Sequence, residues 1–141
     1  MTSDAAASRQ VRAALGVLGM MTFAFGTWAC VAPHSFFTSV AHFEPYNRHF
    51  THDAGALQIG VGVSLLMAAW IDSAAVAALG GFVVFQVAHV ASHLMDRDLG
   101  GRPWLDIPFL GMQALVGVGA LRSAWPANRA GTSWMVSGRR R

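Results

Sequence analysis

Four long apolar stretches, separated by short polar segments, limit what this chain can fold into more than any other feature. They cover approximately residues 11–32, 48–71, 74–94 and 104–122. A helix of about 20 apolar residues crosses the hydrocarbon core of a bilayer. Only 12% of the residues are charged, about half the share in a soluble domain. The sequence therefore predicts an all-α integral membrane protein, a four-transmembrane-helix bundle that forms one membrane domain over residues 1–141.

The polar segments between these stretches predict how the helices are connected. Asp72 and Ser73 form a turn so short that the helices on either side must lie antiparallel. Residues 95–103 contain two glycines and four charges, which predicts a polar loop. Residues 33–47 are aromatic but too polar to cross a bilayer, so we expect an interfacial segment between the first and second helices. Asn47 is placed to cap the second helix.

The arginines predict the orientation of the bundle. Residues 1–8 and 126–141 are expected to be polar tails, and the flanks on their side of the membrane hold seven arginines against three on the other side. Cytoplasmic flanks carry the excess of positive charge, so both termini are predicted to be cytoplasmic, in the inner (plasma) membrane of a bacterium. The last three residues, Arg139, Arg140 and Arg141, are predicted to contact lipid headgroups.

The net charge of +3 could indicate a nucleic-acid partner, but the basic residues are scattered at segment ends. Membrane orientation explains such a distribution better than a phosphate-binding groove does. The predicted partner is therefore the lipid bilayer, with a homo-oligomer or a larger membrane complex as further candidates, and no nucleic acid.

All six histidines lie in the two segments that this topology places on the outer face. Residues 33–53 and 89–106 make up 39 of the 141 residues, yet they also contain five of the seven acids. The cytoplasmic helix ends are equally wet, and they carry no histidine. This distribution predicts a polar site near the outer membrane face.

The start of the second helix supplies the first half of this predicted site. His49, His52 and Asp53 are three or four residues apart, so they share a helix face. Steps of four from His52 reach small residues that allow close helix packing in membranes. These residues are Ala56, Gly60, Ser64 and Ala68. We therefore expect this face to point into the bundle.

The end of the third helix supplies the second half. His89, His93 and Asp96 share one face, and Gln86 continues that face one turn deeper. A glutamine at this depth fits a polar column that faces inward. Gln58 and Gln113 also lie within apolar stretches, where they could form hydrogen bonds between helices.

Imidazole and carboxylate groups are ligands for zinc, iron and copper. Because Cys30 is the only cysteine, a site rich in thiolates is excluded. We predict that a transition metal, or alternatively a haem, binds to His49, His52, Asp53, His89 and His93. Additional candidate ligands are His42, Glu44, Gln86, Asp96 and Asp106. The same side chains also suit a structural polar network, or groups that relay protons or bind substrate without a metal.

Residues 52–66, His-Asp-Ala-Gly-Ala-Leu-Gln-Ile-Gly-Val-Gly-Val-Ser-Leu-Leu, resemble the second-helix region of DoxX-like small membrane proteins. In that region an acidic residue precedes an apolar helix punctuated by glycines, and the four-helix length is similar too. The resemblance implies a four-helix membrane bundle and an association with redox or quinone-linked membrane proteins. By that motif Asp53 and Gly55 carry over, whereas the histidine pairs are not part of the pattern.

Several functions remain open at this point. The first hypothesis is a membrane protein whose metal site serves redox or hydrolytic chemistry, or metal handling. The alternatives are a non-catalytic subunit or assembly factor of a membrane complex, and a small proton-linked transporter or channel, since imidazole changes charge near neutral pH. A lipid-modifying enzyme that uses histidine and aspartate as acid and base is a further alternative.

Overall fold

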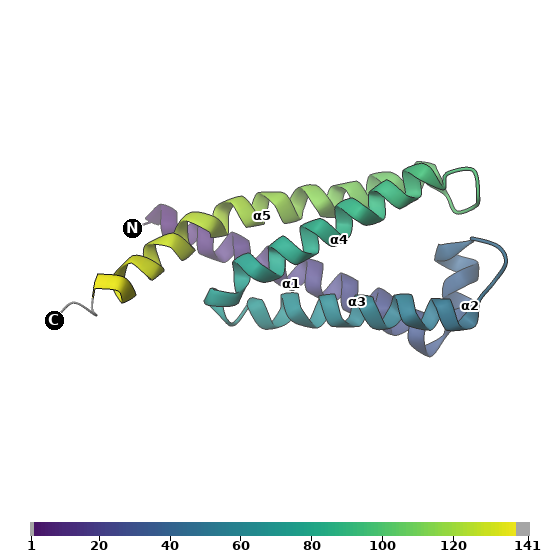
Figure 1. Cartoon of the computed structure of the whole chain (residues 1–141), viewed down its shortest axis with the longest axis horizontal. Coiled ribbons are helices and arrows are strands. Elements are labelled where there is room, and N and C mark those ends of the chain that lie inside the picture. Colours follow the sequence, from purple (N-terminus) through teal and green to yellow (C-terminus); the bar gives the residue numbers. More distant parts are fainter. Residues whose placement is uncertain (1, 138–141) are drawn as a thin grey trace.

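The computed structural model consists of helices joined by short connections; it describes the backbone of residues 2–137 and the side chains of residues 8–125. Across residues 2–137 no strand occurs, which confirms the predicted all-α class. Figure 1 shows four long helices, α1 (Thr2–Val31), α3 (Arg48–Ala68), α4 (Ala75–Met95) and α5 (Pro103–Ser137). The connections between these helices contain three short helices, which are α2 (Pro33–Phe36), the π-helix η1 (Phe37–Ala41) and the 3-10 helix η2 (Asp72–Ala74).

Three of the helices are long and apolar enough to cross a membrane. These helical segments are Ser8–Val31, Asp72–Met95 and Pro103–Trp125. They support the predicted membrane protein. The polar residues in the first turns of α3, among them His49, His52 and Asp53, lower its apolar character.

The helix bounds agree with the prediction in the middle of the chain and differ at its two ends. α1 begins at Thr2 rather than near residue 11, and α5 continues to Ser137 rather than ending near residue 122. The predicted polar tails are therefore largely helical. The N-terminal extension contains three consecutive alanines, and alanine is the strongest helix former. The predicted lipid contacts of Arg139, Arg140 and Arg141 lie outside the described residues.

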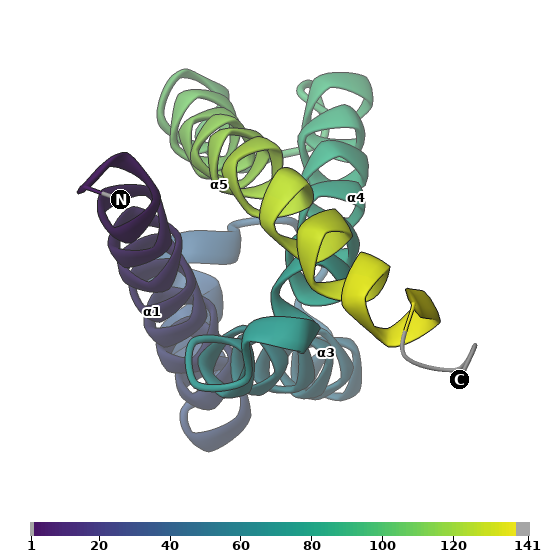
Figure 2. The ribbon, with the colours of Figure 1, turned by 90° about the vertical axis from the view of Figure 1, so that its left-hand side faces the viewer.

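The four long helices form two pairs, α1 with α3 and α4 with α5. Figure 2, seen from the end that holds both chain termini, shows the pairs side by side. The chain reverses direction at each connection, so the two termini lie at one end of the molecule (Figure 1). We call this the terminus end; the opposite end, formed by residues 32–47 and 96–102, is the loop end.

Glycines bring α1 and α3 into direct backbone contact. A Cβ atom added to Gly26 would lie 2.7 Å from the carbonyl oxygen of Gly55, and one added to Gly62 would lie 2.9 Å from that of Gly19. The two glycines of each helix are seven residues apart, which is close to two full turns, so both face the partner helix. Any side chain at these positions would push the pair apart.

The face of α3 that packs is therefore not the predicted one. Ala56, Gly60 and Ser64 are exposed, and only Ala68 of that ridge is buried. Each step of four residues advances about 40° around a helix with 3.6 residues per turn, so a ridge in steps of four leaves one face over its length. The glycines at positions 55 and 62 stay on the face toward α1.

The hydrophobic core lies at the terminus end, where all four long helices meet. Its buried residues are Val11, Leu15, Leu18, Leu65, Ala68, Ala75, Leu79, Phe82, Ala120 and Ala124. Toward the loop end the two helix pairs spread apart (Figure 1). The bundle is thus tightly packed at one end and encloses a cavity at the other.

The two connections at the loop end bind each other above this cavity. The Gly101 amide donates a hydrogen bond to the His42 carbonyl at 3.2 Å, and the Arg102 guanidinium donates to the Ser39 carbonyl. Gly101 has a φ of 71°, a conformation that favours glycine. Residues 33–47 are therefore a folded segment that covers the end of the bundle.

Candidate functional site

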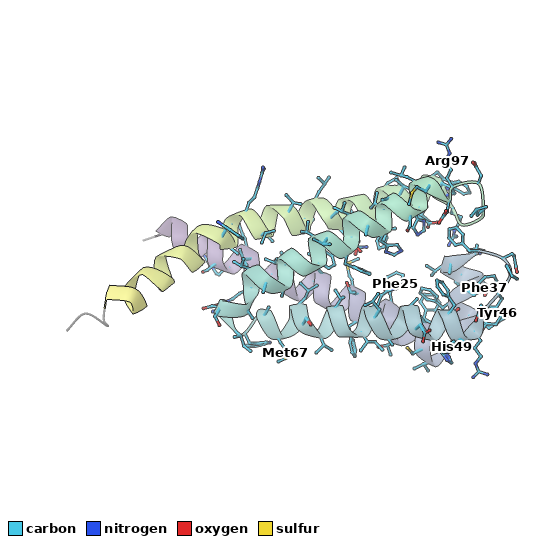
Figure 3. The ribbon with its side chains drawn as sticks, in the orientation of Figure 1. Phe25, Phe37, Tyr46, His49, Met67 and Arg97 are labelled. Carbon is cyan, nitrogen blue, oxygen red and sulfur yellow. The ribbon has the colours of Figure 1, made fainter. Side chains whose placement is uncertain are left out.

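A cavity of about 500 Å³ lies at the loop end, between the two helix pairs. Seven of the nine phenylalanines line it, namely Phe25, Phe36, Phe37, Phe43, Phe50, Phe85 and Phe109. Phe25 on α1 lies between the helix pairs (Figure 3). Its ring centroid is 6.0 Å from that of Phe109 on α5. A volume and an apolar lining of this kind are typical of small-molecule sites. We call this the main cavity.

Three glutamines form the floor of the main cavity, and we call them the glutamine layer: Gln58, Gln86 and Gln113. Each lies nine or ten residues from the loop end of its helix, which is about 13–15 Å at 1.5 Å per residue. The Gln86 Nε2 donates to the Gln113 Oε1 at 3.3 Å, so α4 and α5 are joined at this depth. Gln58 forms no side-chain hydrogen bond with any described residue.

The predicted inward-facing column on α4 is confirmed in part by this geometry. Gln86 is only 2% exposed, and His89 and His93 line the main cavity above it. Gln113 forms the predicted hydrogen bond between helices, and its partner is Gln86. Gln58, the other glutamine expected to bond between helices, forms no such hydrogen bond to the described residues.

The two histidines of α4 lie against each other and against phenylalanines. The ring centroids of His89 and His93 are 5.0 Å apart, and Phe43 meets His93 edge to face at 5.5 Å. The Nδ1 atom of His89 is buried without a hydrogen-bond partner among the described residues. This nitrogen is available to a bound molecule.

Two aspartates complete the polar part of the cavity near the loop end. Asp106 accepts a hydrogen bond from the Arg102 backbone amide at 2.7 Å, close to the start of α5. Asp96, just beyond the end of α4, is exposed. Among the residues whose side chains are described, no arginine lines the main cavity.

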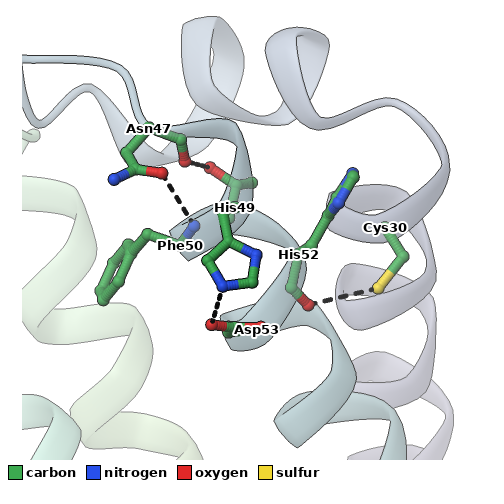
Figure 4. A network of polar contacts seen from close by, with 7 residues as sticks. Cys30, Asn47, His49, Phe50, His52 and Asp53 are labelled. Atoms are coloured by element: carbon green, nitrogen blue, oxygen red, sulfur yellow. Dashed lines mark hydrogen bonds and ion pairs between the residues drawn. The ribbon is translucent and has the colours of Figure 1, made fainter.

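The predicted residues of α3 lie elsewhere. His49 and Asp53 form an ion pair at 3.5 Å on the surface, with side chains 86% and 66% exposed. His52 lies toward α1, where its carbonyl accepts a hydrogen bond from the Cys30 thiol at 3.6 Å (Figure 4). None of these three residues lines the main cavity. Gly55 must face α1, and this fixes the rotation of α3 and turns the histidines away from α4.

The structure thus does not bring the five predicted metal ligands together. In the part of the chain whose side chains are described, no group of three or more histidine, cysteine or acidic residues could hold one metal ion. Of the additional candidates, Glu44 accepts a hydrogen bond from the Tyr46 amide, and the Nδ1 of His42 is buried without a partner among residues 8–125. Binding of zinc, iron, copper or haem stays a prediction.

The phenylalanine lining is the part of the site that the sequence pattern did not indicate. The aromatic residues of 33–47 belong to the segment that is predicted to be interfacial, and Phe36 and Phe37 are buried within the protein. The cap of α3 is as expected: the Asn47 side chain accepts a hydrogen bond from the Phe50 amide at 3.0 Å. That cap fixes the start of α3 next to the folded segment, whose phenylalanines turn inward.

Comparison with protein-family models, curated protein sequences and solved structures finds no match. The resemblance of residues 52–66 to DoxX-like proteins is therefore untested and stays a prediction.

Proposed function

We propose that all four long helices cross the membrane, with both termini on the cytoplasmic side. α3 lies along α1 through the glycine contacts, so a bilayer that surrounds α1 also surrounds α3. Its 21 residues extend over about 32 Å, the approximate thickness of a hydrocarbon core. The excess of arginines beside the two termini supports this orientation.

We propose further that the main cavity binds an uncharged amphiphile, a molecule with an apolar body and a hydrogen-bonding head. One observation carries this proposal: an aromatic cavity has a layer of amide side chains as its floor. Aromatic rings pack well against a planar or prenyl-like body. Polar side chains at this depth of a membrane are costly, and they commonly mark a functional site.

The polar side chains of the cavity indicate the chemistry of the head. Between residues 8 and 125 the lining contains the carboxylates Asp96 and Asp106 and no arginine, so an anionic head would be repelled. Amide groups both donate and accept hydrogen bonds, as does a neutral imidazole. Gln58 and His89 therefore suit a carbonyl or hydroxyl group, which can exchange hydrogen bonds with them.

Binding of three probes that share a decyl chain tests this proposal. The probes are a decyl-naphthoquinone, decyl sulfate and decyltrimethylammonium, which are neutral, anionic and cationic, and binding is measured with the full chain in lipid nanodiscs. We expect saturable binding of one neutral probe per chain and at least tenfold weaker binding of the anionic one. The proposal would be overturned if the neutral probe did not bind saturably, or if the cationic probe bound more tightly than the neutral one.

Gln58→Leu examines the role of the glutamine layer. The change keeps a side chain of similar size but removes the amide that would bond the head. The loss of one such hydrogen bond, about 1.4 kcal/mol, weakens binding about tenfold. Leu115→Ala is the matched control, because Leu115 is 74% exposed on α5 and lies outside the main cavity. Equal affinity in Gln58→Leu and the unaltered chain would argue against a head bound at this layer.

A further inference from the structure

A second cavity, of about 310 Å³, lies in the seam between α3 and α4, and we call it the seam cavity. The described residues that line it all come from these two helices: Ala54, Leu57 and Gln58 of α3, and Phe85, Ala88, His89 and Ser92 of α4. Five of these residues also line the main cavity. The two cavities therefore adjoin, with Gln58 and His89 at the boundary.

The two residues that belong to the seam cavity alone face the outside of the bundle. Leu57 is 58% exposed, and Ala88 is exposed as well. α3 and α4 contact each other less than the members of either helix pair do. Small side chains at Ala54 and Ala88 leave the seam partly unfilled. The seam cavity thus joins the main cavity to the lateral surface of the protein.

The depth of the seam cavity determines what it faces. Leu57 lies nine residues from the loop end of α3, and Ala88 lies seven from that of α4. At 1.5 Å per residue these positions are about 13 Å and 10 Å below the loop end. In a bilayer with a hydrocarbon core of about 30 Å, that depth holds acyl chains, not water.

From this geometry we propose that the seam between α3 and α4 is the lateral entrance to the main cavity. The molecule that uses it is a chain-bearing amphiphile drawn from the bilayer. Its head lies at Gln58 and His89, and its chain leaves through the seam past Leu57 and Ala88 into the lipid. The inference rests on the proposed function, and it adds both the route of entry and the place of the chain.

Substitution of a seam residue by tryptophan tests whether the seam is the entrance to the main cavity. Ala88→Trp places a large side chain in the seam cavity, and Ala91→Trp is the matched control, because Ala91 is exposed on the same helix and lines neither cavity. Leu57→Trp is a second seam variant that replaces a side chain which is already large and exposed. The probes are the decyl-naphthoquinone and naphthoquinone without the chain, bound to the full chain in nanodiscs.

We expect both seam variants to bind the decyl probe at least tenfold more weakly or more slowly than the control does. The chainless probe should bind all variants alike. If Ala88→Trp and Leu57→Trp bound the decyl probe as the control does, the proposal of a lateral entrance would be overturned. The proposed function would be unaffected. Failure of both probes to bind the unaltered chain would instead overturn the proposed function.

Discussion

Gly26 of α1 and Gly55 of α3 touch through their backbones, and a Cβ atom added to Gly26 would lie 2.7 Å from the Gly55 carbonyl oxygen. Gly26→Ala should therefore destabilise the protein by about 1–3 kcal/mol, the usual cost of overpacking a tight contact. SDS titration of the purified protein in mixed micelles measures this change. Gly60→Ala is the control: a Cβ there meets nothing within 4 Å, and alanine favours a helix by up to about 1 kcal/mol. Equal midpoints for the two variants would contradict the close contact.

Phe82 lies in the core at the terminus end and is 1% exposed. Phe82→Ala leaves a cavity there and should lower the free energy of unfolding by about 3–5 kcal/mol. Phe50→Ala provides a comparison with the same chemical change, because Phe50 is 71% exposed. If both variants lost the same stability in SDS titration, the core would not lie where the structure places it.

Asn47 caps α3, and its side chain accepts the Phe50 amide hydrogen bond. Asn47→Ala should destabilise the protein by about 1 kcal/mol, whereas Asn47→Ser keeps a capping oxygen and should lose much less. The hydrogen-exchange rate of the Phe50 amide measures the protection that this hydrogen bond gives. Faster exchange in Asn47→Ala but not in Asn47→Ser is the expected result, and identical protection in both would show that the cap is not formed.

Excess zinc should raise the unfolding midpoint if the side chains predicted from the sequence bind one ion together, although no described group of three potential ligands is placed to do so. A ligand that binds only the folded protein would raise that midpoint. The measurement is SDS titration with and without zinc, followed by chelator. If zinc raises the midpoint and His89→Ala abolishes the rise, the metal site predicted from the sequence is present after all.

His49→Ala should change stability by less than about 1 kcal/mol, since exposed ion pairs contribute little. The His49 and Asp53 side chains are 86% and 66% exposed. The same SDS titration measures the change, with Asp53→Asn as the companion variant. A loss of several kcal/mol would show that this pair is buried against a partner.

The sequence was sufficient for the helices and insufficient for their rotation. Apolar length located α3 and α4 to within a few residues, and hydrogen-bonding chemistry located the Asn47 cap. The rotation of α3 depends on which of its small residues meets a complementary glycine on α1. Gly55 meets Gly26, and neither helix alone contains that information. His52 consequently lies toward α1 instead of toward His89.

The main cavity could not be predicted for a related reason. Helical periodicity indicates which residues are apolar, but it does not indicate whether two helix pairs converge or spread. Gln86 was expected to face inward, and it does. The seven phenylalanines that surround the space above it come from five separate segments, and only the fold brings them together.

The two ends of the molecule differ, because the terminus end is packed and the loop end holds the main cavity. Phe82 lies one turn below Gln86, and the core residues of all four helices fill the space beneath the glutamine layer. The main cavity is therefore closed toward the terminus end, and a molecule bound as proposed would have to leave by the route through which it entered. Passage from the main cavity to the terminus end would require this core to separate.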